Sequence, residues 1–275
     1  MQAPDEPRLG IYAWDNGWME ARRRLDLLEQ TWDPETRVSL DGIGLQPGWT
    51  CLEVGGGGDS VVRWLCDAVG PDGRVITVDI DTRFLESIDA PNLEVLRADV
   101  VSDGLPDGPF DLIHTRAVLM HIPARDRLLA EIAARLRPGG TLLLEEFDFH
   151  SMVAAPTPAY GAFWLEAADI MRRAVGLDGT WARHLPARLS ALGLCDIRAR
   201  MSASLFRGGS PEAEFFRVTW LQARDWLLGG GMAKEVFEEG IAFLEDETQW
   251  LPSPANVTVT GRSPAESNTS MRRPL

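Results

Sequence analysis

The chain has 275 residues, 45% of them hydrophobic and 25% charged, which is enough apolar material for a large buried core. Its formal net charge of −14 at pH 7 opposes binding to nucleic acid and to anionic membrane surfaces. No apolar run approaches the roughly 18 residues of a membrane span, and the first residues do not resemble a signal peptide. We therefore expect a cytoplasmic protein that acts on a small molecule, with no nucleic-acid or membrane partner. The sequence leaves open whether the protein forms a homodimer.

The three cysteines, Cys51, Cys66 and Cys195, favour a reducing compartment, because an odd number cannot pair completely. They do not have the spacing of metal ligands, and the four histidines are scattered along the chain. We therefore expect no metal site.

Residues 1–48 are expected to form a helical lid. Leu25 and Trp32 belong to a pattern with helical spacing. Pro34 indicates the start of a second short helix, because proline is favoured in a first helical turn. Trp14 either belongs to the core or closes over a ligand.

The stretch from Thr50 to Ser60 reads as a strand, a tight turn and the start of a helix. An apolar run that ends at Val54 is followed by four consecutive glycines, Gly55–Gly58, and then by an amphipathic segment. Residues without a Cβ atom allow a sharp turn and a close approach of the backbone to a bound molecule. The turn is therefore predicted to bind a ligand. A dinucleotide fingerprint would need glycine at position 60, so an NAD(P)-dependent oxidoreductase is a less favoured alternative.

A second predicted strand, Arg74–Val78, runs directly into Asp79, which lies 24 residues after Gly55. This interval is close to the roughly 20 residues between the glycine turn and the ribose-binding acid of a nucleotide-binding βαβ unit. The carboxylate of Asp79 can accept hydrogen bonds from both ribose hydroxyls. Asp81 is expected to cap a helix that begins near Thr82.

Three more strands are predicted at Leu93–Leu96, Phe110–His114 and Thr141–Leu144. A helix is expected to start at Pro123, and the run Arg137-Pro138-Gly139-Gly140 ends it before the next strand. Strands that alternate with helices indicate a parallel sheet covered by helices.

These motifs, in this order, resemble the core of class I S-adenosylmethionine-dependent methyltransferases, and in particular the small-molecule enzymes of actinobacterial natural-product biosynthesis. Glu53-Val54-Gly55-Gly56-Gly57-Gly58-Asp59 is similar to the first motif of this family, with Asp59 where a third glycine is usual. The resemblance implies an α/β fold with a Rossmann-like, mostly parallel sheet and helices on both faces. We place this core at residues 49–150, with the N-terminal helical lid before it and a helical insertion after the fifth strand.

The resemblance also implies the cofactor, S-adenosylmethionine, with S-adenosylhomocysteine as product. It assigns Asp79 to the ribose, Asp99 to the adenine amino group and the backbone of Val100 to the adenine ring. Arg37 either reaches the cofactor carboxylate or forms a surface ion pair. The residues expected at the cofactor are Glu53, Gly55, Gly56, Gly57, Asp59, Asp79, Ile80, Asp99, Val100, Thr115 and Arg116.

Residues 151–264 are expected to supply helical substrate-cap insertions and the last strands of the same domain, and residues 265–275 a disordered tail. Apolar residues recur at helical spacing between positions 160 and 174, and a second predicted helix, at positions 211–228, is rich in aromatic residues. Such aromatic stripes belong either to the core or to a pocket for a flat, apolar substrate. Strands are predicted at 195–205 and 257–262.

His121 and His150 follow the fourth and fifth strands, so either can serve as a general base or as a structural, hydrogen-bonded histidine. A base is needed only if the acceptor must lose a proton. The resulting hypothesis is a methyltransferase that modifies an oxygen or nitrogen atom of a small, aromatic or apolar metabolite. A non-methylating cyclase or sensor on the same fold is an alternative, because a fold does not fix a function.

Overall fold

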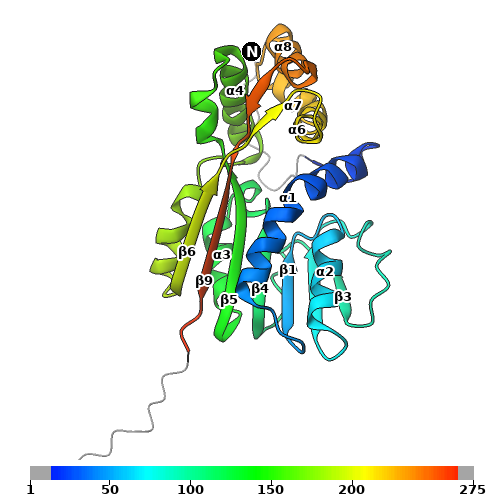
Figure 1. The fold of residues 1–275 in the computed structure, drawn as a ribbon, viewed down its shortest axis with the longest axis vertical. Helices are drawn as coiled ribbons and strands as arrows, with labels where there is room; N and C mark the ends of the chain where they lie inside the picture. The colour runs from blue at the N-terminus through cyan, green and yellow to red at the C-terminus, as the bar shows by residue number, and fades with distance from the viewer. Residues whose placement is uncertain (1–13, 266–275) are drawn as a thin grey trace, which may run out of the picture.

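The computed structural model describes residues 14–265, which form a central sheet with a helical cap above one end of it (Figure 1). The main sheet has seven strands in the order β3-β2-β1-β4-β5-β9-β6, and a separate ribbon pairs β7 with β8. The strands are β1 (Thr50–Val54), β2 (Arg74–Asp79), β3 (Leu93–Arg97), β4 (Phe110–Arg116), β5 (Leu136–Asp148), β6 (Cys195–Ser202), β7 (Leu205–Arg207), β8 (Trp250–Pro252) and β9 (Ala255–Arg262). The helices are α1 (Ala21–Ile43), α2 (Ser60–Val69), α3 (Arg125–Ala133), α4 (Pro158–Val175), α5 (Leu185–Ala191), α6 (Pro211–Gln222), α7 (Arg224–Gly229) and α8 (Lys234–Glu245).

Strands β1 to β5 pair in parallel, whereas β9 lies antiparallel between β5 and β6. The chain leaves β1 toward β2 on one side and returns to β4 on the other. The point where the strand order reverses therefore lies between β1 and β4, which is where open α/β sheets bind ligands. This arrangement confirms the predicted Rossmann-like, mostly parallel sheet.

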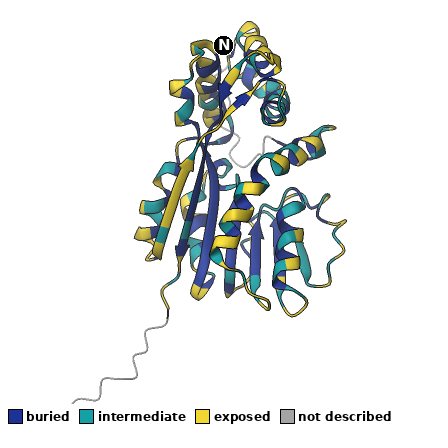
Figure 2. Cartoon of the chain, viewed as in Figure 1, coloured by how far each residue is buried: buried dark blue, intermediate teal, exposed yellow. Residues whose placement is uncertain are grey.

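The two faces of the sheet are covered by different helices, because successive side chains of a strand point to opposite faces. Ile113 of β4 belongs to an apolar cluster with Ile132 of α3 and Leu189 of α5. Its neighbour Leu112 belongs to a second cluster with Leu65 of α2. The inner strands are buried on both faces, as Figure 2 shows, which explains their continuous apolar sequences.

Helix α1 is one continuous helix of 23 residues with Pro34 inside it, so the prediction of two helices divided at this proline is wrong. A proline inside a helix removes one backbone hydrogen bond. Burial on both sides of Pro34 offsets this cost, since Trp32, Thr36 and Leu40 all face the protein interior. The helix crosses the front of the sheet and reaches the cap (Figure 1), so it can contribute side chains to both.

The helix expected after Asp81 is absent from this part of the described chain, where residues 83–87 form turns instead. Asp81 does not cap a helix. Its carboxylate accepts hydrogen bonds from the backbone and side chain of Arg83, at 3.2 and 3.0 Å. This local bonding competes with helix formation, as is typical of aspartate near turns.

The cap consists of α4, α6, α7 and α8 with the β7–β8 ribbon, and it forms an apolar cluster rich in aromatic rings. The expected helix at 211–228 is divided at Ala223 into α6 and α7, and the expected strand at 195–205 into β6 and β7. The insertion after the fifth strand is thereby confirmed as mainly helical. Among residues 14–265, none of the helices combines the length and apolar composition that a bilayer crossing requires.

Candidate functional site

A cavity of about 460 Å³ lies at the carboxyl ends of the strands, between the sheet and the cap. This volume is in the range of small-molecule sites. It is bounded by the segments that follow β1, β2, β3 and β4, by the end of β5, and by α1, α4 and α6. Ten of the predicted site residues line it: Glu53, Gly55, Gly56, Gly57, Asp79, Ile80, Asp99, Val100, Arg116 and His121.

The glycine turn forms the floor of this cavity. Gly55 and Gly57 have φ angles of 74° and 46°, in the left-handed region that favours glycine. At Gly56, a Cβ atom would lie 2.4 Å from the Thr77 hydroxyl oxygen, so a side chain there would displace the strand below. Glycine at these positions therefore allows the turn to pack closely on β2, and the backbone of the turn lines the cavity.

Asp79 is fixed at the end of β2 by the turn itself. Its Oδ2 accepts a hydrogen bond from the Gly57 amide at 2.9 Å, and its Oδ1 accepts one from the Asp81 amide at 2.9 Å. Burial raises the pKa of Asp79, while these two amides oppose the rise. The carboxylate keeps lone pairs directed into the cavity and can accept further hydrogen bonds from a ligand.

Asp99 and Val100 line the next side of the cavity, after β3. The Asp99 Oδ1 atom accepts the Val101 amide at 2.8 Å, which fixes the turn. The Ala98 amide donates to the Asp79 carbonyl at 3.0 Å, so the loop after β3 is joined to the end of β2. The two predicted nucleoside contacts therefore share one edge of the cavity.

Three predicted residues, Asp59, Thr115 and His150, do not line the cavity. Asp59 turns toward Arg22 and Arg63, with ion pairs of 3.3 and 2.9 Å. Partial burial would raise the pKa of Asp59, but these arginines outweigh it and lower the pKa.

Thr115 is fully buried on the face of β4 opposite Arg116, because neighbouring residues of a strand alternate. His150 is exposed on the 3₁₀ turn after β5. The structure therefore gives Asp59 an ion-pairing position, Thr115 a core position and His150 a surface position.

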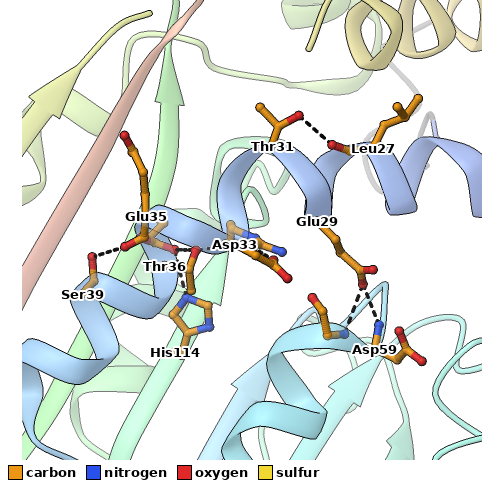
Figure 3. Close-up of polar contacts among 12 residues, drawn as sticks. Leu27, Glu29, Thr31, Asp33, Glu35, Thr36, Ser39, Asp59 and His114 are labelled. Atoms are coloured by element: carbon orange, nitrogen blue, oxygen red, sulfur yellow. Dashed lines mark hydrogen bonds and ion pairs between the residues drawn. The ribbon is translucent and has the colours of Figure 1, made fainter. Parts of the chain in front are cut away.

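Glu53 belongs to a buried network that joins the cavity to α1. Its Oε2 lies 2.6 Å from the Nδ1 atom of His114, whose Nε2 lies 3.4 Å from Glu145 Oε2. Thr36 of α1 donates to the same Glu145 oxygen at 2.5 Å, and Figure 3 shows Thr36 beside His114. Burial alone would lower the pKa of His114, but Glu53 and Glu145 raise it to about 9, so the ring is a cation at neutral pH.

Arg116 connects the same network to the cavity wall. Its Nη1 donates to Asp33 at 2.9 Å and to the Thr36 hydroxyl at 3.0 Å. Both partners belong to α1, so this arginine holds the helix against the end of β4. Its charge is already neutralised by Asp33 within the protein.

Glu29 of α1 is a cavity residue that sequence reasoning missed. Its Oε1 accepts the amides of Asp59 and Ser60, at 2.8 and 3.2 Å, as Figure 3 shows for Asp59. These amides belong to the first turn of α2, which has no intrahelical acceptor for them. A Cβ atom at Gly58 would lie 1.9 Å from the Glu29 carboxylate, so the fourth glycine makes room for this cap.

The part of the cavity under the cap has aromatic walls. Trp164 of α4 lies edge-to-face against Phe216 and Trp220 of α6, with ring centroids 5.0 and 4.8 Å apart. Such edge-to-face packing fixes the rings in place. The other aromatic wall residues are Trp14, Phe147, Phe149 and Phe215. The aromatic stripes thus belong partly to the core and partly to the wall of the cavity.

His121 lines the cavity beside one of these aromatic residues. Its ring centroid is 4.8 Å from that of Trp14. Burial, with the nearby charges of Arg24 and Arg125, lowers the pKa of His121 to about 3, so the ring is neutral at pH 7. The loop that carries it is held by Glu146, which accepts the Leu119 amide at 2.8 Å.

Arg24 and Asn16 also line the cavity, although the sequence did not single them out. They are only 5% and 7% exposed. Arg37, the arginine that the sequence offered for a ligand carboxylate, is exposed and does not line this cavity. Within residues 14–265 no group of three histidine, cysteine, aspartate or glutamate side chains could hold a metal ion.

Comparisons with known proteins agree with this geometry. Residues 52–144 match the family model described as a methyltransferase domain. An uncharacterized 37.1 kDa protein in a transposon of Streptomyces fradiae is 35% identical over 120 residues, covering 42% of this chain and 35% of that protein. The ubiquinone/menaquinone biosynthesis C-methyltransferase UbiE of Hahella chejuensis is 28% identical over 157 residues, covering 54% of this chain and 63% of that enzyme. The chain thus matches less than two thirds of the length of either relative.

Solved structures show the same fold. The mycolic acid cyclopropane synthase CmaA1, in complex with S-adenosylhomocysteine, superposes with a TM-score of 0.56 at 15% identity and 85% coverage of both chains. A phosphoethanolamine N-methyltransferase of Haemonchus contortus, also with S-adenosylhomocysteine, has a TM-score of 0.54 at 14% identity, with 93% of this chain and 61% of that chain covered. At these identities the likeness concerns the fold, and the domain match places residues 52–144 in a methyltransferase domain.

Proposed function

We propose that this chain, whose residues 52–144 match a methyltransferase domain, uses S-adenosylmethionine to methylate an oxygen or nitrogen atom of a small, aromatic or apolar metabolite. One observation carries the proposal. A single cavity joins the glycine turn to a wall of aromatic side chains, so cofactor and acceptor can occupy it together. His121 lines the same cavity, beside Trp14.

The residues around the turn fit the cofactor in chemical type. The glycine turn lines the cavity with backbone, the carboxylate of Asp79 suits the ribose hydroxyls, and Asp99 with the Val100 backbone suits adenine. Glu53, a buried carboxylate at the cavity wall, suits the positive amino group of the methionine part. When bound, the cofactor supplies an activated methyl group and a good leaving group.

The aromatic part of the cavity suits a flat acceptor. Seven of its lining residues are phenylalanine or tryptophan, whose rings offer large apolar area and little conformational freedom. The main task of the protein is then to hold the acceptor atom in line with the methyl group and to exclude water. Buried, edge-to-face rings are suited to that task.

His121 is the remaining candidate for contact with the acceptor atom, because His150 lies on the surface. A histidine with a pKa of about 3 is a weak base, but its neutral ring can accept a hydrogen bond from a hydroxyl or amino group. Such a bond would orient the acceptor lone pair. The proposal therefore gives His121 an orienting role before transfer.

A carbon acceptor is the second candidate, because the relative from Hahella chejuensis is named as a C-methyltransferase. A place in natural-product biosynthesis is also part of the proposal, and it rests on the resemblance of the sequence motifs alone. The oxidoreductase alternative loses support, since the matching family model describes a methyltransferase domain. A non-methylating cyclase or sensor would bind the cofactor without transferring its methyl group.

The first test is calorimetric titration with S-adenosylmethionine, S-adenosylhomocysteine and NADH. Binding of the two sulfur ligands but not of NADH is the expected result. Asp79→Ala should weaken S-adenosylhomocysteine binding by about 1–3 kcal/mol, because hydrogen bonds to a charged group are lost, whereas the exposed Asp72→Asn should not change it.

The second test offers aromatic phenols, amines and quinols with methyl-labelled cofactor. Product analysis by NMR then distinguishes oxygen, nitrogen and carbon acceptors. Cofactor binding without any labelled product across such a panel would favour the cyclase or sensor.

A further inference from the structure

Arg24 is a buried cation of the cavity wall that has no partner in the described chain. It is 5% exposed, and its Nε and Nη2 atoms make no hydrogen bond within residues 14–265. The two preceding arginines are both paired. Arg22 meets Asp26 at 2.7 Å, and Arg23 meets Glu214 at 2.6 Å. Arg24 thus differs from its neighbours in facing the cavity rather than a carboxylate.

An unpaired buried guanidinium is costly, because a desolvated charge without an opposite charge or hydrogen bonds destabilises the folded state. The chain has a formal net charge of −14, so carboxylates are abundant, yet none of those in the described part of the chain meets Arg24. Leu25, Leu28 and Asn16 line the same cavity. The amide oxygen of Asn16 is likewise buried and makes no hydrogen bond within residues 14–265.

The free atoms of Arg24 have a specific geometry. Nε and Nη2 form one edge of the planar guanidinium, and two parallel N–H groups on one edge match the two oxygens of a carboxylate. We propose that Arg24 is the carboxylate-binding residue of this cavity and forms a two-pronged ion pair with a bound molecule. The proposal rests on the proposed function, since the same cavity is assigned to cofactor and acceptor.

Two molecules can supply this carboxylate. Arg24 lines the same cavity as the glycine turn, where the methionine end of the cofactor is expected. Arg24 also lowers the pKa of His121 through its charge, so it is near the acceptor part as well. The shared chemistry is a carboxylate, and the experiment separates the two sources.

The experiment compares ligands with and without a carboxylate on wild type, Arg24→Met and Arg24→Lys. S-Adenosylhomocysteine and 5′-methylthioadenosine share the nucleoside and the thioether, but only the first has the amino-acid part. If the cofactor supplies the carboxylate, Arg24→Met should lower affinity for S-adenosylhomocysteine about tenfold or more and leave methylthioadenosine unchanged. Arg24→Lys keeps the charge but not the two parallel N–H groups. Its affinity for S-adenosylhomocysteine should lie between those of the wild type and Arg24→Met.

If the acceptor supplies the carboxylate, S-adenosylhomocysteine should bind equally well to all variants. In that case 2-naphthoate should bind to the wild-type complex with S-adenosylhomocysteine and lose about tenfold or more in Arg24→Met, while 2-naphthol should not. The proposal is overturned if neither carboxylate ligand is weakened selectively. Failure of the wild type to bind either adenosine ligand would instead contradict the proposed function.

Arg23→Met is the matched control, because it removes a neighbouring arginine whose side chain is 54% exposed and paired on the surface. It should leave every ligand affinity unchanged. Thermal unfolding without ligand gives an independent readout. Arg24→Met should melt at or above the wild-type temperature, because an unpaired buried cation is removed. A clearly lower melting temperature would point to a partner inside the protein and overturn the proposal.

Discussion

Glu53 and His114 face each other across the neighbouring strands β1 and β4, with Glu53 Oε2 2.6 Å from His114 Nδ1 and both side chains buried. Glu53 also lines the cavity. The histidine therefore holds the carboxylate that the cofactor amino group is expected to meet. A second carboxylate, Glu145, lies on the other side of the ring and links it to α1 through Thr36.

The first prediction concerns the stability that this pair supplies. The pKa of His114 rises from 6.5 to about 9 on folding, so the folded protein holds a proton that the unfolded chain releases between these values. The contribution of this proton to the free energy of unfolding is complete below pH 6.5 and is lost as the pH rises through 9. At 1.36 kcal/mol per pKa unit, it amounts to about 3 kcal/mol.

His114→Gln should therefore remove most of the fall in unfolding free energy between pH 6.5 and 9, as measured by urea denaturation. It should also weaken S-adenosylhomocysteine binding, because Glu53 loses its positioning partner. His184→Gln, at an exposed position, is the control and should keep the wild-type pH dependence. An unchanged slope in His114→Gln would mean that the ring is neutral in the folded protein.

The second prediction concerns Gly58. Replacement by alanine puts a Cβ atom 1.9 Å from the Glu29 carboxylate, which must then leave the first amides of α2. Loss of such a helix cap costs about 1–2 kcal/mol of stability. Gly42→Ala is the matched control, because position 42 lies inside α1 with no atom within 4 Å of the added carbon. Gly42→Ala should stabilise the protein by about 0.5–1 kcal/mol. Equal effects of Gly58→Ala and Gly42→Ala on the free energy of unfolding would refute the role of Glu29 as the cap of α2.

The features that could be predicted from the sequence are local in the chain. The turn at Gly55–Gly58, the acid Asp79 at the end of its strand, and the parallel sheet all follow from patterns within a few tens of residues. The missing information was the partner of each side chain. Glu29 contacts Asp59 from 30 residues away, and no spacing rule connects them.

The three consecutive arginines of α1 illustrate the same limit. Arg22, Arg23 and Arg24 are alike in sequence and differ only in their angle around the helix, about 100° per residue. Which of them faces the cavity depends on how α1 lies against the sheet and the cap. Pro34 concealed that arrangement, because it indicated the start of a second helix where buried residues on both sides keep one helix continuous.

The third prediction separates the two histidines that follow the fourth and fifth strands. His121→Asn should reduce methyl transfer to an identified acceptor while leaving S-adenosylhomocysteine affinity within about twofold, because its ring is assigned to orienting the acceptor. His150→Asn should leave both unchanged, since the side chain is exposed outside the cavity. The measurements are initial rates and calorimetry on the two variants. Equal losses of activity in both would refute this division of roles.

The last prediction follows from two buried groups of one loop that act in opposite directions in acid. Burial raises the pKa of Glu146 from 4.5 to about 7, although three loop amides oppose the rise. The folded state therefore binds the proton more tightly, so stability increases as the pH falls from 7 to 4.5. His121 has the reverse shift, from 6.5 to about 3, so stability decreases as the pH falls below 6.5.

In the wild type these two effects offset each other between pH 4.5 and 6.5. Protonation of Glu146 and His121 together should therefore change the melting temperature little in this range. Glu146→Gln removes only the stabilising effect of acid, so its melting temperature should fall more steeply than that of the wild type as the pH is lowered. His121→Asn removes only the destabilising effect of acid. Its melting temperature should therefore fall less than that of the wild type as the pH is lowered, or should rise. Melting temperatures at several pH values in this window test both, and parallel curves for the three proteins would show that neither group is shifted as its burial requires.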